Sequence, residues 1–97
     1  MTVDEFEWGQ PLRMRTEVNG QVRQDSDTSD LYFGIEALVA YISQAMTLFP
    51  GDIIATGSPA GVAFFMNPPG FLRPGDVVRC EIEKVGTIEN RVRAEAT

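Results

Sequence analysis

Residues 48–62 constrain the fold more than any other part of the chain, because they join a tight turn, a short apolar run and a glycine-flanked loop. Pro50 presets φ for the first central position of a turn, and Gly51 supplies the positive φ that the second position of a type II turn demands. Residues 53–55 are apolar without alternation, which in so short a run is typical of a strand buried on both faces. We therefore expect a central strand here.

The loop that follows this strand, residues 56–61, has small side chains and two glycines. Backbone N–H groups in such a loop can approach a ligand closely, and the Ser58 hydroxyl lies beside them. Loops that leave buried strands are common places for binding sites. A tight turn that binds nothing fits the same residues equally well.

Composition excludes several kinds of chemistry. The chain has no histidine, which removes Ser-His and Cys-His nucleophile pairs and every histidine metal site. The single cysteine, Cys80, rules out an internal disulfide and a cysteine-rich zinc site. A net charge of -6 opposes binding to a phosphate backbone, so we expect no nucleic acid partner.

The length of 97 residues allows one small domain with a modest core. No stretch has the length of a membrane-spanning helix, and the acidic N-terminus is unlike a basic and then apolar secretory signal. We therefore expect a cytoplasmic protein with no membrane partner. Residues 1–11 are predicted to form a loosely held acidic arm, and residues 12–97 the domain.

Alternating side chains predict a hairpin near the start of that domain. Residues 12–18 alternate apolar or neutral side chains with charged ones, which is the period of a half-exposed strand. Asn19-Gly20 fits a two-residue type I′ turn, after which residues 21–24 would return antiparallel.

A second pair of strands is predicted near the C-terminal end. The run Arg73-Pro74-Gly75-Asp76 repeats the Pro-Gly-Asp turn of residues 50–52 and starts a strand at 77–83, where Cys80 belongs to the apolar face. The chain then turns at residues 84–86 and runs back to residue 94.

A single helix is predicted from Ile35, because apolar side chains recur at steps of three and four residues as far as Met46. We expect this helix to pack on the sheet and to end at Pro50-Gly51. Tyr41 and Ser43 on its flanks are interpreted as structural. Residues 62–72 are apolar, aromatic and broken by prolines, so they cannot form a regular central element and must cover a core, a partner or a pocket.

The predicted fold class is mainly β with one helix, in five or six strands. Hairpin turns separate most of the strands, which favours an antiparallel or mixed β-roll over a doubly wound sheet.

Residues 25–30 resemble the start of a calcium-binding loop, with Glu36 at the place of the bidentate ligand. However, Asp30 stands where that loop requires glycine, so a solvated turn rich in helix-capping residues is the favoured interpretation. Gln24 or Thr28 reaching a substrate is a further hypothesis.

The loop at Ser58 fits ligand binding better than nucleophilic catalysis. No lysine follows its glycines as in a Walker loop, and no histidine is available to activate the serine. A hydroxyl with neighbouring N–H groups suits a carboxylate or enolate oxygen. The remaining carboxylates belong to separate turns or to a solvent face, so no metal site and no catalytic residue is predicted within the chain; they are Asp52, Asp76, Glu81 and Glu83.

Several motifs, taken in their order along the chain, resemble those of one protein family. The resemblance covers nearly the whole chain from Leu12 onward. The motifs are Asn19-Gly20 within 18–24, the residues 28–30 before the helix, the run 48–62 with Pro50-Gly51-Asp52 and Thr56-Gly57-Ser58-Pro59, and the second Pro-Gly-Asp turn within 72–78. In this order and spacing the sequence resembles the C-terminal part of the fumarylacetoacetate hydrolase family.

The resemblance implies an incomplete mixed β-sandwich roll of this family's C-terminal domain type, usually dimeric. It also implies a divalent-metal-dependent enzyme using Mg²⁺ or Mn²⁺ on 2-oxo and acylpyruvate-like acids, by C–C hydrolysis, isomerisation or decarboxylation, as in aromatic catabolism. In that family a Thr-Gly-Thr-Pro loop contributes to the substrate pocket, and here Ser58 replaces the second threonine. The implied substrate-binding residues are Gln24, Thr56, Gly57 and Ser58.

The family's metal ligands, catalytic lysine and lid residues lie upstream of the matched region. We therefore expect the chain to be inactive alone and to need a complementing N-terminal half or a dimer partner. The alternative is a truncated, noncatalytic β-rich module that acts through dimer or partner association along exposed strand edges.

Overall fold

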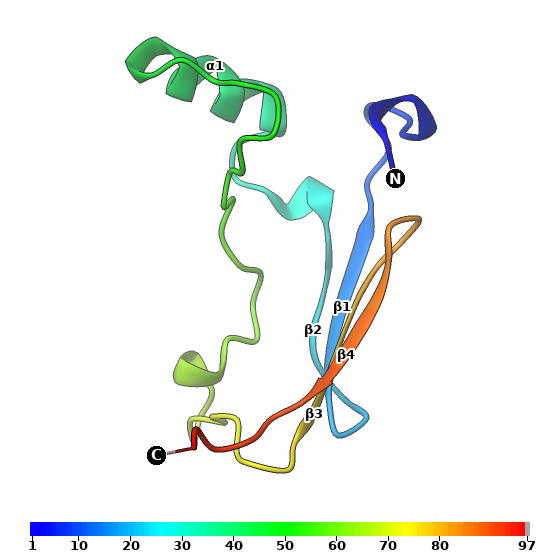
Figure 1. Cartoon of the computed structure of the whole chain (residues 1–97), viewed down its shortest axis with the longest axis vertical. Coiled ribbons are helices and arrows are strands. Elements are labelled where there is room, and N and C mark those ends of the chain that lie inside the picture. Colours follow the sequence, from blue (N-terminus) through cyan, green and yellow to red (C-terminus); the bar gives the residue numbers. More distant parts are fainter. Residues whose placement is uncertain (97) are drawn as a thin grey trace.

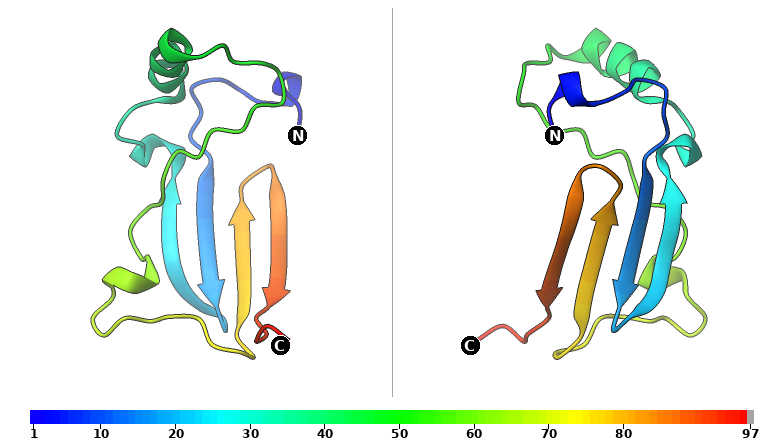
Figure 2. Two further views of the ribbon diagram at one scale, coloured as in Figure 1. Left: turned by 60° about the vertical axis from the view of Figure 1, so that its left-hand side comes forward. Right: turned by 90° about the vertical axis from the view of Figure 1, so that its right-hand side faces the viewer.

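The computed structural model describes residues 1–96, and its centre is one antiparallel sheet (Figure 1). The sheet consists of β1 (Arg13–Val18), β2 (Gln21–Asp27), β3 (Val77–Ile82) and β4 (Gly86–Arg91). The strand order is β2-β1-β3-β4, and every neighbouring pair is antiparallel (Figure 2). The fold class of mainly β with one helix is confirmed, and the described residues form four strands, fewer than the five or six expected.

Both predicted hairpin turns are present, since residues 19–20 join β1 to β2 and residues 83–85 join β3 to β4. Asn19 and Gly20 have φ values of 50° and 76°, which is the pair of positive angles that a type I′ turn requires. The two Pro-Gly-Asp turns share one design, since Gly51 and Gly75 each have φ of 96°. In each turn the aspartate side chain accepts the N–H three residues earlier at 2.8 Å, Phe49 at Asp52 and Arg73 at Asp76. The turns predicted at the two Pro-Gly-Asp runs are therefore present.

The register of β1 against β2 contains a β-bulge. Thr16 pairs with Gln24 and Glu17 pairs with Val22, so Arg23 is the extra residue on β2. Strand β2 also extends to Asp27, beyond the expected end at Gln24. Residues 25–27 therefore belong to the sheet and not to a solvated turn.

The helix α1 (Ile35–Ala45) is present, but two expectations about it are wrong. It ends at Ala45, followed by the C-cap Met46, whose N–H donates to the Ile42 carbonyl, and not at Pro50-Gly51. It also lies beyond one end of the sheet and covers neither face (Figures 1 and 2). Within the described residues, none of the side chains of α1 is buried, and Val39 on its apolar face is 39% exposed.

The predicted buried strand at residues 53–55 is also wrong. This segment is extended but belongs to no strand, and Ile53 is 95% exposed. A strand needs a neighbouring backbone to accept and donate its hydrogen bonds. Within residues 1–96, the backbone of 53–61 makes no hydrogen bond to other backbone, so the apolar sequence alone does not produce a strand here.

The segment 62–72 is irregular, as predicted. It contains a short 3-10 helix, η3 (Ala63–Phe65), followed by prolines. Phe64 and Phe65 meet edge to face with ring centroids 5.1 Å apart, yet their side chains are 64% and 81% exposed. Their large apolar area therefore covers little within the described chain.

The fold is open around a small core. Among residues 1–96, Leu12 and Val18 are the buried hydrophobic side chains, and Cys80 on β3 is half-buried beside Thr16. The radius of gyration is 16.2 Å, against about 12.5 Å for a compact domain of this length. No helix among these residues has the length and apolar character needed to cross a bilayer.

The N-terminal arm contains a single 3-10 turn, η1 (Val3–Glu5). The Glu5 carboxylate accepts the Thr2 N–H at 2.7 Å, which satisfies one end of this turn. Phe6 and Trp8 pack edge to face at 5.3 Å, and Trp8 remains 63% exposed. The arm thus has local order, while its separation from the domain at residue 11 stays a prediction.

Candidate functional site

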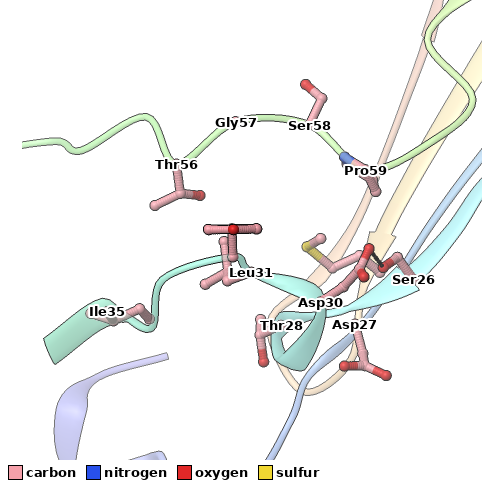
Figure 3. Close-up of a pocket in the computed structure, with 12 residues that line it drawn as sticks. Ser26, Asp27, Thr28, Asp30, Leu31, Ile35, Thr56, Gly57, Ser58 and Pro59 are labelled. Carbon is pink, nitrogen blue, oxygen red and sulfur yellow. Dashed lines mark hydrogen bonds between the residues drawn. The ribbon is translucent and has the colours of Figure 1, made fainter. Parts of the chain in front are cut away.

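A cavity of about 320 Å³ lies between the end of β2 and the glycine-containing loop (Figure 3). The loop contributes residues 56–59 to one wall. The opposite wall comes from residues 26–28 and 30–32, with Met14 from β1 and Ile35 at the start of α1 completing it. The structure therefore brings three of the predicted site residues to one cavity; they are Thr56, Gly57 and Ser58.

The wall opposite the loop is ordered by capping contacts. Its 3-10 helix, η2 (Thr28–Asp30), begins at Asp27, whose carboxylate accepts the Ser29 N–H at 2.7 Å and the Ser29 hydroxyl. The Ser29 hydroxyl and then its N–H hold the pKa of Asp27 below its usual range. Ser26 donates to Asp30 at 2.9 Å. The residues of this segment that were predicted from the sequence to cap a helix therefore form capping hydrogen bonds.

The electrostatic character of this cavity is negative. Asp27 and Asp30 line it, and no arginine or lysine is among its lining residues within the described chain. An anionic ligand would therefore be repelled from the wall that contains Asp30 unless a cation accompanied it. The apolar remainder of the lining comes from side chains such as Met14, Leu31 and Ile35.

Thr56 and Ser58 face opposite sides of the loop (Figure 3). The Thr56 side chain points toward Leu31 and the cavity, whereas the Ser58 hydroxyl points away from Leu31 and Asp30. Gly57, between them, has φ of 98°, a left-handed value that glycine adopts without strain. The loop can therefore present one hydroxyl on each side.

Gln24, the fourth predicted site residue, is not among the residues that line this cavity. Its side-chain amide donates to the Pro59 carbonyl at 3.3 Å. Thr28 does line the cavity, but its hydroxyl accepts the Leu12 N–H at 2.9 Å. Whether Gln24 also contacts a substrate stays a prediction.

The described residues do not fit a metal ion. Among residues 1–96, no group of three or more histidine, cysteine, aspartate or glutamate side chains is placed to hold one. Within the calcium-loop alternative, Asp25 forms an ion pair with Arg13 at 3.0 Å and Asp27 caps η2. A bound Mg²⁺ or Mn²⁺ would therefore need ligands from outside these residues.

Sequence reasoning missed the wall opposite the loop. Met14, Ser26 and Leu31 lie far from residues 56–59 in the sequence, and nothing local in their sequence marks them as pocket residues. The only indication of this wall in the sequence is the hypothesis that Thr28 reaches a substrate. Their proximity to the loop follows from the path of the chain through α1 and back along β2 (Figure 2).

Comparison with known proteins identifies the family. The model of the family described as fumarylacetoacetate (FAA) hydrolase C-terminal matches residues 1–93. The chain belongs to the fumarylacetoacetate hydrolase family. The resemblance seen in the sequence motifs is thereby confirmed, and the match extends through the acidic arm.

Relatives and solved structures of the fumarylacetoacetate hydrolase family agree with this assignment. The rat protein "Oxaloacetate tautomerase Fahd2a, mitochondrial" is 49% identical over 81 residues, which are 84% of this chain and 26% of that protein. The fumarylacetoacetate hydrolase of psychrophilic Exiguobacterium antarcticum matches with a TM-score of 0.90 and 39% identity, over 98% of this chain and 34% of that one.

A third similar protein is the maleylpyruvate hydrolase of Sphingobium sp. SYK-6, solved in complex with manganese (II) ion and pyruvate. Its TM-score is 0.82 and its identity 39%, over 96% of this chain and 33% of that one. The chain has the fold of the fumarylacetoacetate hydrolase C-terminal domain, and it spans about a quarter of the length of the curated relatives it matches.

Proposed function

We propose that this chain supplies one wall of the active site of a divalent-metal-dependent enzyme that acts on 2-oxo or acylpyruvate-like acids. The observation that carries the proposal is the placement of Thr56, Gly57 and Ser58 in one wall of a cavity, in a fold shared with a hydrolase solved with pyruvate. Hydroxyl and backbone N–H donors of this kind suit the carboxylate or enolate oxygens of such acids.

The orientation of the loop indicates where the acid group would bind. Because Asp27 and Asp30 give the cavity a negative wall, a substrate carboxylate is expected on the side of the loop that carries the Ser58 hydroxyl. Thr56 would then face the part of the cavity lined by Leu31 and Ile35. Ser58 would hold and orient the acid, without acting as a nucleophile.

The reaction type stays open between hydrolysis, isomerisation and decarboxylation. The names of the relatives include both a tautomerase and a hydrolase, so the similarity does not select one of them. Mg²⁺ or Mn²⁺ is proposed for the complete domain, with ligands outside residues 1–96. A cytoplasmic location also stays a prediction, since the names of several relatives include the word mitochondrial.

A chimera tests the proposal directly. This chain would replace the matching third of the Sphingobium maleylpyruvate hydrolase, so that the remainder of that enzyme supplies what residues 1–96 lack. We expect the chimera to bind pyruvate in the presence of Mn²⁺, measured by calorimetry. Ser58→Ala should weaken binding by roughly ten- to a hundredfold, as expected for loss of one hydrogen bond to a charged group, and Ser58→Thr should retain it.

The result that contradicts the proposal is a folded, Mn²⁺-binding chimera that binds no pyruvate, or one in which Ser58→Ala binds pyruvate as tightly as the parent. The isolated chain is expected to show no stoichiometric Mg²⁺ site in the same measurement. A stoichiometric site there would contradict the absence of metal ligands.

The alternative is a noncatalytic module that acts by association. It is supported by the exposure of large apolar side chains on one open fold, including Ile53 at 95%, Phe65 at 81% and Tyr32 at 94%. Sedimentation of the isolated chain, together with pyruvate binding by the chimera, distinguishes the noncatalytic module from the enzyme. Stable self-association together with no pyruvate binding in the chimera would favour the module.

A further inference from the structure

The bulge on β2 directs two consecutive side chains toward the same neighbouring segment. Because Arg23 is the extra residue between the Gln24 and Val22 pairings, the alternation of side chains is broken at this point. Gln24 contacts residue 59, and Arg23 contacts residues 66 and 70. A regular strand would send these two side chains to opposite faces.

Two contacts hold the C-terminal limb of the loop against this bulge. The Gln24 side-chain amide donates to the Pro59 carbonyl at 3.3 Å. Gly61 packs so closely on β2 that a Cβ atom there would overlap the Arg23 carbonyl oxygen, and its φ of 100° also favours glycine. The loop is therefore fixed just after Ser58, by one polar contact and one backbone contact.

The Arg23 side chain fixes the next part of the same segment. Its Nη1 atom lies 2.8 Å from Met66 Sδ and donates to the Gly70 carbonyl at 3.3 Å. Gly70 leaves room for this guanidinium, because a Cβ atom at that position would overlap Nη1. Arg23 and Gln24 are both half-buried by these contacts.

We propose that the β-bulge at Arg23 is a clamp, in which Gln24 and Arg23 position the 56–61 loop and the segment behind it. Gln24 is then a positioning residue that acts through the Pro59 carbonyl, and it need not touch a ligand. Backbone 53–61 makes no hydrogen bond to other backbone in the described chain, so this side-chain contact and the Gly61 contact determine where Thr56 and Ser58 lie. The value of the clamp for catalysis rests on the proposed function.

The test is ¹⁵N relaxation of the full chain without any ligand. Gln24→Met keeps the length of the side chain and removes the donor, whereas Gln24→Glu places a carboxylate oxygen against the Pro59 carbonyl. We expect the order parameters of Gly57, Ala60 and Gly61 to fall toward about 0.6, and to fall further in Gln24→Glu than in Gln24→Met. Gln21→Glu, the same change at an exposed position of β2, is the matched control and should leave them unchanged.

A role limited to packing would affect the Met and Glu variants equally, so the order of the two variants is the decisive readout. Unchanged loop order parameters in both variants would overturn the clamp, as would a uniform loss of order throughout β2. Because no ligand is present, this result is separate from pyruvate binding in the chimera. Either hypothesis can therefore fail while the other stands.

Discussion

The Asn19 side-chain amide donates to the Asp76 carboxylate at 2.8 Å, although the two residues are 57 positions apart along the chain. The Asn19 Oδ1 atom also accepts the Val77 N–H at 2.9 Å. The first hairpin turn is thus hydrogen-bonded to the turn that precedes β3, at the end of the sheet where β1 ends and β3 begins. These two bonds extend the contact that the pairing of β1 with β3 makes between the two hairpins of the sheet.

Substitution of Asn19 should therefore lower the free energy of unfolding. Asn19→Gly keeps the positive φ of 50° and removes both side-chain bonds, and we expect a loss of about 1–2 kcal/mol. Asn19→Ala should cost roughly 1 kcal/mol more, because alanine is strained in the left-handed region. Urea unfolding measures both, with Gln21→Ala as an exposed control expected within about 0.5 kcal/mol of the parent. Parent-like stability of Asn19→Gly would show that the bridge contributes nothing.

Asp76 should make stability depend on pH. The Arg73 N–H and then the Asn19 amide hold the pKa of Asp76 below its usual range. A carboxyl whose native pKa is depressed contributes stability above its unfolded pKa of about 3.9, and this contribution is lost as pH falls through the native value. Asp76→Asn should therefore lower the urea midpoint at pH 7 by more than at pH 3. An equal difference at both pH values would contradict the assignment.

Gly61 and Gly57 form a matched pair for testing the contact between the loop and β2. Both have positive φ, 100° and 98°, but only Gly61 lies against another backbone; the space around Gly57 is open. Gly57→Ala should cost about 1–2 kcal/mol through left-handed strain alone. Gly61→Ala should cost roughly 1–3 kcal/mol more, because its Cβ overlaps the Arg23 carbonyl. Equal losses by thermal or urea unfolding would mean that the loop moves freely away from β2.

The isolated chain should tolerate changes at Ile53 and not at Leu12. Ile53 is 95% exposed, so Ile53→Ser is expected to change the free energy of unfolding by less than about 0.5 kcal/mol. Leu12 is 8% exposed, and Leu12→Ala should cost about 2–4 kcal/mol. Ile53→Ser should also reduce any self-association seen by sedimentation, because it removes exposed apolar area. A large loss of stability at Ile53 would show that this residue has cover within the chain.

Local sequence signals predicted the elements whose causes are local. The alternation of residues 12–18 produced β1, Asn19-Gly20 produced the type I′ turn, and the two Pro-Gly-Asp runs produced turns with the expected positive φ at glycine. The three- and four-residue periodicity likewise predicted α1 from Ile35. Each of these depends on side-chain spacing or on the φ preference of one residue, which the sequence contains in full.

The failures share a different cause. Residues 53–55 have the composition of a buried strand, but burial and pairing depend on a neighbour that the described chain does not place there. The same holds for α1, whose apolar face was expected on the sheet and lies beyond its end. An apolar pattern indicates that a surface is stabilised by burial, but it does not indicate which part of the protein buries it.

By itself, then, the sequence determined the turns, the periodic elements, the family and the loop at Thr56 to Pro59 as the candidate site. Only the tertiary structure decided that Thr56 and Ser58 face opposite sides of that loop, that Asp27 and Asp30 lie across the cavity, and that Gln24 binds the Pro59 carbonyl. The physical reason is that turn geometry and periodicity are set by neighbouring residues, whereas these placements depend on a strand register and a bulge that bring distant segments together.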